Sequence, residues 1–298
     1  MHGIIPLRKE AGVTSFDCVK KIRQLLGIKK VGHTGTLDPD VEGVLPICVG
    51  EATKLIPFLQ RHTKTYVAEV TLGAATTTED KSGEPIEQKE VVHHPKLSEI
   101  DDVLQSFTGT IEQIPPMYSA VKVKGKRLYE YARAGIEVER PKRHVTIHHI
   151  ERLSGYDEKT KSFRFQVTCS KGTYVRTLCV DIGKKLGFPA HMSFLQRIES
   201  DSFHLKETVT LAEVEEAIER GDEEHLLEPI EKALPNLDTL HVDHKTKQKV
   251  LHGQKLPRNS QSFNTEEVIV LYEKKLLAIY KVLKDDLNPV RVFNLLNV

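Results

Sequence analysis

The first clear pattern along the chain is helical. It begins after Thr14 and Ser15, residue types that favour helix N-caps, and it stops at Gly27. In between, apolar side chains recur at the spacing of one helix face, at Phe16, Val19, Ile22 and Leu26. These positions predict a helix over residues 15–26.

Four further stretches have the patterns of β-strands. Residues 44–49 are almost wholly apolar, as expected for a short buried strand. Alternation of apolar and other side chains predicts strands with one buried face at residues 66–72 and 163–169. Valine alternates with lysine from residue 121 to 124, and a basic hairpin is therefore predicted at 121–127.

A second helical pattern follows the strand at 163–169. Residues 170–173 are expected to turn the chain, and Gly187 stops the pattern. The apolar side in between consists of Val175, Leu178, Cys179, Ile182 and Leu186. Tyr174 and Arg176 fall in the first turn of this helix, directly after a strand, where polar groups can point into a cleft.

The pattern changes twice in the C-terminal third. Residues 208–234 predict acidic amphipathic helices, which Pro235 ends. From Leu240 onward, short apolar runs such as 268–272 and 276–280 predict a small β-rich domain. A length of 298 residues allows two domains, and we place them at 1–238 and 239–298.

The formal net charge of +1 conceals an uneven distribution. Residues 201–239 carry 3 Lys and Arg against 12 Asp and Glu, whereas the segments before and after carry net charges of +6 and +4. A polyanion could bind the basic segments while the acidic segment faces away.

The sequence lacks the patterns of exported, membrane-spanning and disulfide-rich proteins. Residues 1–7 lack the charged start, long apolar stretch and cleavage site of a signal peptide, and no apolar run approaches the ~20 residues of a membrane helix. The cysteines contain no Cys-x-x-Cys pair, which argues against a zinc site and a disulfide framework. We expect a cytoplasmic protein with reduced thiols and no membrane association.

The densest potential chemistry lies in residues 32–43, with the sequence GHTGTLDPDVEG. This glycine-rich loop holds one imidazole, two threonines and three carboxylates, and Pro39 restricts Asp38 to an extended backbone. Such a loop can hold one carboxylate rigidly. Taken alone, however, these residues favour an Asp-Pro turn without chemistry.

A resemblance changes that balance. The loop resembles the signature of the pseudouridine synthase B family, in which the aspartate before the proline is catalytic. Other stretches resemble the same family and together span most of residues 9–200: residues 12–15, 64–66, 115–122 and 169–178. Asp40 and Glu42 stand where the family more often has small or apolar residues, and we assign them no role.

The resemblance implies an α+β fold, with a pseudouridine synthase domain built on a mixed, largely antiparallel sheet and flanking helices. It also implies a small C-terminal β-barrel of the PUA type that binds RNA. The implied activity is the isomerisation of uridine 55 in the TΨC loop of tRNA to pseudouridine. We expect a monomer that recognises the T arm without a guide RNA and uses no cofactor.

The resemblance also implies roles for individual residues. Asp38 is the catalytic residue, either by attacking the anomeric carbon or by removing a ribose proton, and both routes stay open. Arg176 is expected to pair with Asp38 and keep it ionised. Tyr174 would help to remove the C5 proton, Tyr66 would stack on the flipped uracil, and His33 would fill the space that the base leaves.

The predicted hairpin offers candidates for phosphate contacts, namely Lys122, Lys124, Lys126 and Arg127. Such contacts give salt-dependent affinity without base specificity, although a solvated hairpin has the same pattern. Lys9, Lys20 and Lys21 are weaker candidates of the same kind.

Metal and nucleotide cofactor sites are not supported. The histidines lack cysteine partners and a metal-binding spacing, both in the group His144, His148 and His149 and in the pair His93 and His94. The glycines form neither a Walker loop nor a dinucleotide fingerprint.

Three other functions fit parts of the sequence. A guide-dependent relative from box H/ACA particles shares the catalytic loop but usually carries extra terminal segments. An RNA-binding protein or tRNA folding chaperone would not need Asp38, Tyr66, Tyr174 and Arg176 together. A glycosidase needs two carboxylates across one bond, and neighbours such as Asp38 and Asp40 in one loop rarely achieve that.

Overall fold

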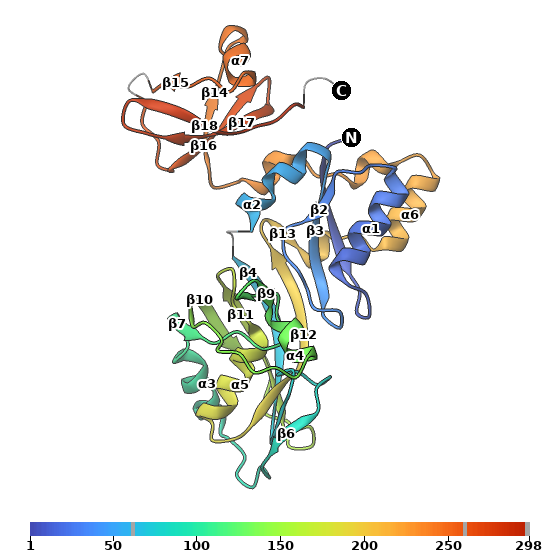
Figure 1. The fold of residues 1–298 in the computed structure, drawn as a ribbon, viewed down its shortest axis with the longest axis vertical. Coiled ribbons are helices and arrows are strands. Elements are labelled where there is room, and N and C mark those ends of the chain that lie inside the picture. Colours follow the sequence, from blue (N-terminus) through green and yellow to red (C-terminus); the bar gives the residue numbers. More distant parts are fainter. Residues whose placement is uncertain (61–62, 259–260, 296–298) are drawn as a thin grey trace. The chain divides into compact units, whose positions relative to one another are not determined.

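The computed structural model describes residues 1–60, 63–258 and 261–295 (Figure 1). They form two compact units, one of Met1–Gln60 with Asp201–Val298 and the other of Arg61–Ser200. The first unit is therefore discontinuous in sequence. The domain boundary predicted at residue 238 lies within the first unit and stays a prediction.

Antiparallel strands form the N-terminal part of the first unit. β1 (Gly3–Lys9) pairs along its whole length with β3 (Glu42–Val49), and β2 (Val31–His33) also pairs with β3. Every residue of β3 after Glu42 is buried, in agreement with its apolar sequence. The strand predicted at residues 44–49 is confirmed.

Helix α1 (Ser15–Leu26) begins and ends where its sequence predicts. The Thr14 hydroxyl accepts a hydrogen bond from the backbone NH of Asp17, and the Asp17 carboxylate accepts one from the NH of Thr14. This capping box satisfies NH groups that an isolated helix leaves without partners. Gly27 then ends the helix in the left-handed conformation, with φ of 66°.

The acidic segment at 208–234 is less regular than predicted. Within these residues, all of which the structure describes, only α6 (Leu211–Glu219) is an α-helix, and short 3-10 helices follow it, η3 (Glu223–Leu226) and η4 (Ile230–Ala233). The prediction of α-helix after residue 219 is wrong because Gly221, with φ of 70°, and Pro229, which lacks an NH group, interrupt the hydrogen-bonding ladder. Outside its C-terminal segment, the first unit also contains the short elements η1 (Gly50–Leu55), α2 (Ile56–Leu59), β13 (Phe203–His204) and η2 (Leu205–Glu207).

An antiparallel sheet forms the centre of the second unit, with the strand order β12-β4-β11-β10-β7. The strands are β4 (Lys64–Leu72), β7 (Gly109–Gln113), β10 (Arg143–Arg152), β11 (Ser162–Cys169) and β12 (Ala190–Ser200). β4 and β11 confirm the strands predicted at 66–72 and 163–169.

Two helices cover this sheet. α5 (Val175–Lys185) packs against β4 and β12, and α3 (Leu97–Gln105) packs against β10. The two helices also contact each other, so they lie on the same face. α5 confirms the helix predicted after residue 173.

Two small ribbons and one short helix complete the second unit. They are β5 (Ala74–Thr76) with β6 (Pro85–Gln88), β8 (Lys122–Val123) with β9 (Lys126–Arg127), and α4 (Leu128–Arg133). The β8–β9 ribbon is the predicted basic hairpin. Its turn residues Lys124 and Gly125 both have positive φ, as a two-residue hairpin turn of type I′ requires.

The C-terminal segment forms a second sheet in the first unit, in the order β14-β16-β17-β18-β15. β14 and β16 are parallel and the other pairs are antiparallel. The elements are β14 (Asp238–His241), α7 (His244–Leu251), β15 (Leu256–Pro257), β16 (Glu267–Tyr272), β17 (Lys275–Val282) and β18 (Asp286–Val292). The predicted β-rich segment and the predicted α+β class are confirmed, whereas α7 was not predicted.

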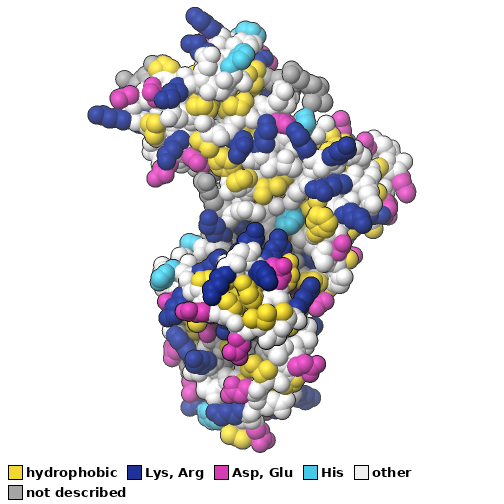
Figure 2. Space-filling model, viewed as in Figure 1, with side chains coloured by type: hydrophobic (Ala, Val, Ile, Leu, Met, Phe, Trp, Pro, Cys, Tyr) yellow, Lys and Arg dark blue, Asp and Glu magenta, His cyan; other side chains and the backbone are white. Residues whose placement is uncertain are grey.

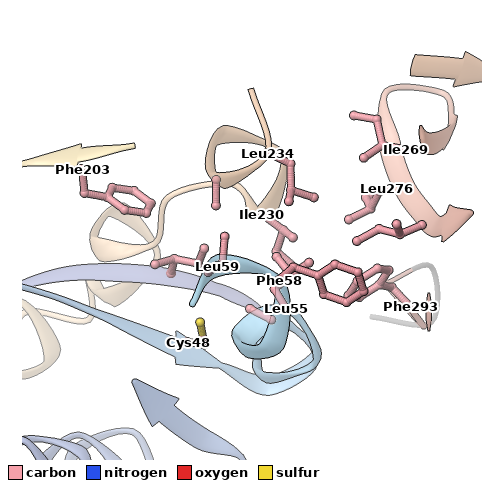
Figure 3. Close-up of a cluster of buried hydrophobic side chains, with 14 of the residues drawn as sticks. Cys48, Leu55, Phe58, Leu59, Phe203, Ile230, Leu234, Ile269, Leu276 and Phe293 are labelled. Carbon is pink, nitrogen blue, oxygen red and sulfur yellow. The ribbon is translucent and has the colours of Figure 1, made fainter. Parts of the chain in front are cut away.

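The second sheet shares a hydrophobic core with the N-terminal part of the same unit. Leu276 and Phe293 belong to one buried cluster with Leu55 and Phe58, which lie in η1 and α2 (Figure 3). The C-terminal sheet is therefore packed into the first unit and is not a freely tethered module.

Polar contacts join the same two segments around Glu51, whose side chain is only 9% exposed. Its carboxylate lies 2.6 Å from Lys54 Nζ and accepts a hydrogen bond from the Asn294 NH at 3.1 Å. Lys54 also donates to the carbonyl of Val292 at 2.9 Å. Burial acts to raise the pKa of Glu51, but these hydrogen bonds outweigh it and hold the pKa below its usual value.

Because the core is shared, Phe293→Ala is predicted to destabilise both the C-terminal sheet and the N-terminal part of the first unit. Removing a fully buried phenylalanine costs about 3 kcal/mol or more. We expect faster hydrogen exchange in both β3 and β17, measured by mass spectrometry. Phe16→Ala is the control, because Phe16 is 62% exposed and its removal should cost less than about 0.5 kcal/mol. Faster exchange confined to β17 would contradict a shared core.

Candidate functional site

The loop that carries Asp38 connects β2 to β3 in the first unit. Its start is fixed because the Thr34 NH donates to the carbonyl of Pro46 and the Thr34 hydroxyl donates to the Asp201 carboxylate at 2.9 Å. Its tip is a turn in which the carbonyl of Asp38 accepts from the Val41 NH. Asp38 itself is half-buried, so part of the residue is exposed.

Lys9, the last residue of β1, anchors this loop at Pro39. The side chain has no exposed surface, and Nζ donates to the carbonyls of Glu10, Val13 and Pro39 at 2.9, 2.6 and 2.8 Å. A buried ammonium is tolerated only when such partners replace its hydration. The prediction that Lys9 contacts phosphate is wrong, because the side chain lies in the core.

Ser15 fixes the other side of Asp38. Its hydroxyl donates to the carbonyl of Leu37 at 3.1 Å and accepts from the NH of the same residue at 2.9 Å. Leu37 and Pro39, the two neighbours of Asp38, are therefore both held by side chains from the β1–α1 region. This arrangement leaves the Asp38 backbone little freedom to move.

Arg176 has a tightly defined environment in the second unit. The side chain is only 6% exposed, and its two terminal nitrogens donate to the carbonyls of Thr78 and Tyr118, each at 2.9 Å. Asp80 Oδ2 lies 3.8 Å from Nη1. No role was predicted for Asp80, whose only signal in the sequence is a polar, turn-rich segment between residues 76 and 84.

Tyr174 is the N-cap residue of α5 and is half-buried. The buried side chain of Gln113 holds its backbone from both sides, since the Tyr174 NH donates to Gln113 Oε1 at 3.0 Å and Gln113 Nε2 donates to the Tyr174 carbonyl at 3.2 Å. Gln113 is a second supporting residue that the sequence did not reveal. It sits at the end of β7 without a recognisable pattern.

Tyr66 and His33 occupy strands. Tyr66 lies on β4, between Val167 of β11 and Arg197 of β12 in register, and it is half-buried. His33 is the last residue of β2, opposite Ile47, and is also half-buried. The predicted contacts of both rings with a base stay predictions.

The predicted site residues divide between the two units. Asp38 and His33 belong to the first unit, and Tyr66, Tyr174 and Arg176 belong to the second. The predicted ion pair between Asp38 and Arg176 therefore stays a prediction.

The basic hairpin presents its charges to solvent. Its four cationic side chains are exposed, namely Lys122, Lys124, Lys126 and Arg127. Next to the hairpin, Tyr129 has the guanidinium carbons of Arg127 and Arg133 at 5.8 and 5.3 Å from its ring centre. On the face drawn in Figure 2, Lys and Arg side chains are spread over both units and not confined to one element. Of the weaker candidates, Lys20 is exposed and Lys21 pairs with Glu215 at 2.6 Å.

Three further observations concern metal sites, membrane helices and thiols in the residues that the structure describes. Among them, no group of three or more His, Cys, Asp or Glu side chains is placed to hold a metal ion, and no helix is long and apolar enough to cross a membrane. The cysteines are buried as free thiols, and burial raises the pKa of Cys169 to about 11, which disfavours a reactive thiolate.

Comparison with known proteins gives consistent matches. Residues 23–175 match the family model described as the N-terminal domain of TruB family pseudouridylate synthase, and residues 176–235 match the C-terminal domain of tRNA pseudouridylate synthase B. A protein from Oceanobacillus iheyensis named tRNA pseudouridine synthase B is 52% identical over 297 residues, which is 98% of each chain. One of the same name from Halalkalibacterium halodurans is 55% identical over 94% of this chain and 93% of its own.

Solved structures show the same fold. A chain in a Cbf5–Nop10–Gar1 complex matches 98% of this chain and 84% of its own, with a TM-score of 0.75 and 28% identity. A chain in the archaeal box H/ACA sRNP Nop10–Cbf5 complex matches 98% and 86%, with a TM-score of 0.74 and 26% identity.

The anchoring of the Asp38 loop predicts the effect of Lys9→Met. Methionine fills similar space but cannot donate to the carbonyls of Glu10, Val13 and Pro39. The Pro39 carbonyl keeps a hydrogen bond from the Gly12 NH, and the loss of the other donors costs about 1 to 3 kcal/mol. We expect a lower urea midpoint and a larger fall in turnover than in RNA affinity, because the loop moves but the RNA-binding surface does not. Lys159→Met, an exposed change in the second unit at a residue without a predicted RNA contact, should alter neither. A Lys9→Met protein with normal turnover would show that the loop does not need this anchor.

Proposed function

Because the chain belongs to the TruB family of pseudouridylate synthases, we propose that it converts uridine 55 in the TΨC loop of tRNA to pseudouridine, with Asp38 as the catalytic residue. The observation that carries this proposal is the Asp38 loop, in which Lys9 and Ser15 fix the two residues that flank the half-buried Asp38. A rigidly held carboxylate suits a reaction in which one side chain must meet one ribose carbon.

The reaction is an isomerisation and needs no outside reactant. The bond between uracil N1 and ribose C1′ breaks, the base rotates while bound, and a bond forms between C5 and C1′. The proton that leaves C5 is balanced by the one that N1 gains. Asp38 assists either by attacking C1′ or by removing a ribose proton to give a glycal.

The other predicted residues serve this reaction at defined points. The base must leave its stack before Asp38 can reach the sugar, and Tyr66 is proposed to stack on it once it has flipped. His33 is proposed to fill the vacated space. Arg176 is proposed to pair with Asp38 and keep the carboxylate ionised, and Tyr174 to assist removal of the C5 proton.

We propose the T arm of tRNA as the substrate, bound by a monomer in the cytoplasm without a guide RNA. The names of the bacterial relatives, which match this chain along almost their whole length, support tRNA. One of the matching solved structures is an archaeal box H/ACA sRNP complex, and it motivates the alternative of a guide-dependent enzyme. The exposed cations of the β8–β9 hairpin are proposed to contact phosphates.

Asp38→Asn tests the catalytic assignment. Purified protein is incubated with unmodified tRNA transcript and no cofactor or guide RNA, and pseudouridine is mapped by carbodiimide-dependent primer extension. We expect one new stop at the T-loop uridine, and a fall in rate of more than about a thousandfold in Asp38→Asn with tRNA binding retained. Asp40→Asn, in the same loop and exposed, is the matched control and should stay active. An active Asp38→Asn protein refutes the role of Asp38, and no stop with the unaltered protein favours a guide-dependent enzyme.

The salt dependence of tRNA binding tests the hairpin. Removal of one phosphate-binding cation should make the slope of log affinity against log salt less steep by about 0.7 to 0.9. Lys124→Ala should show such a change, measured by filter binding at several salt concentrations. Lys159→Ala removes an equally exposed charge from another turn of the same unit and should leave the slope unchanged. Equal slopes for both variants would exclude the hairpin as a phosphate-binding surface.

A further inference from the structure

Glu79 lies in the turn between β5 and β6 and has an unusual backbone. Its φ of 64° is in the left-handed region, which residues other than glycine rarely adopt and which costs free energy. The Glu79 NH donates to the carbonyl of Thr76, and its carbonyl accepts from the NH of Met192 on β12. The turn is therefore docked on the sheet with Glu79 at a fixed position.

The side chain of Glu79 points to the start of α5 and is only 19% exposed. The Thr177 hydroxyl donates to Glu79 Oε2 at 2.6 Å, and Arg140 Nη1 lies 3.8 Å from Oε1. Burial raises the pKa of this carboxyl, although Thr177 and the nearby guanidinium groups oppose the shift. A carboxylate in such a place is costly unless its contacts are specific.

Three consecutive residues of the turn meet two consecutive residues of α5. The carbonyl of Thr78 accepts from Arg176, the carboxylate of Glu79 accepts from Thr177, and the carboxylate of Asp80 lies 3.8 Å from Arg176. The Glu79–Thr177 hydrogen bond is the shortest of these contacts, and it lies in sequence between the two contacts to the arginine.

A second tie runs through Arg140. Its Nη1 donates to the carbonyl of Pro115 at 3.1 Å and also faces Glu79, while Arg176 donates to the carbonyl of Tyr118. The segment that begins at Pro115 is thus attached to the same turn by two arginines. Movement of the turn would therefore disturb both hydrogen bonds of the Arg176 guanidinium, the one to the Thr78 carbonyl and the one to the Tyr118 carbonyl.

We propose that Glu79 is a positioning residue, which fixes the turn of Thr78 and Asp80 on Arg176 through its hydrogen bond with Thr177. This inference rests on the proposed role of Arg176 in the isomerisation. Glu79 itself does not contact the substrate. Its removal lets the Arg176 side chain move, so the chemical step slows while tRNA binding persists.

A double-mutant cycle of Glu79→Ala and Thr177→Val tests this. Single-turnover rates of pseudouridine formation are measured with enzyme in excess over tRNA transcript, and Kd is measured by filter binding. Each single variant should slow the step by about tenfold, since small displacements of a positioned group have effects of that order or larger, with Kd within about twofold. The double variant should be no slower than the slower single variant by more than about twofold, because both changes remove one interaction.

Two further variants serve as matched controls. Thr177→Ser keeps the hydroxyl and should keep the rate within about twofold, so the Thr177 pair gives an answer even if Glu79→Ala does not fold. Glu84→Ala removes an exposed carboxylate from the same turn and should have no effect. Circular dichroism at the assay temperature establishes that each variant is folded.

The outcomes separate the two proposals. Additive effects on the rate, a change in Kd alone, or equal rates for Thr177→Val and Thr177→Ser would overturn the positioning role of Glu79 while leaving the proposed function intact. Absence of pseudouridine with the unaltered protein would instead refute the proposed function.

Discussion

The charge of Lys9 is buried in the first unit, where the carbonyls of Glu10, Val13 and Pro39 replace the water that it loses. An ammonium without such partners would strongly destabilise the fold, so the three carbonyls must converge whenever this unit is folded. One of them belongs to the residue after Asp38. The burial of Lys9 in the folded unit therefore constrains the position of Pro39 and with it the geometry of the candidate catalytic loop.

The discontinuous first unit extends this dependence to the far end of the chain. β3 follows the Asp38 loop directly, and its residue Cys48 belongs to the same buried cluster as Phe293. Glu51 and Lys54 add polar contacts to the segment 292–294. Cutting off the C-terminal sheet would thus expose part of the core beside β3, and its contribution to RNA binding is better measured with surface substitutions than with truncation.

The sequence predicted those elements that carry their own periodicity and stop signals, such as α1 with its Thr14 cap and Gly27 end. β3, β4, β11 and α5 were predicted for the same reason. The segment 220–234 was not, because Gly221 and Pro229 leave only single 3-10 turns, which have no period long enough to recognise. α7 was missed because Val250 is its only buried residue, so its sequence has almost no apolar stripe.

Prediction of the candidate site from the sequence was limited in a different way. Asp38, Tyr174 and Arg176 could be nominated because they stand in motifs, but their supports come from elsewhere: the two carbonyls that hold Arg176 are 98 and 58 residues away in sequence. Lys9 was predicted to contact phosphate, and Glu79 stood in the polar, turn-rich segment 76–84 without a predicted role. Lys9 and Gln113 contact backbone groups and Glu79 contacts a side chain far away in sequence, and no local pattern encodes such contacts. On the proposed roles of Lys9 and Glu79, a chain that keeps every motif residue but changes either of these two would be a slower enzyme, and motif matching would not detect the difference.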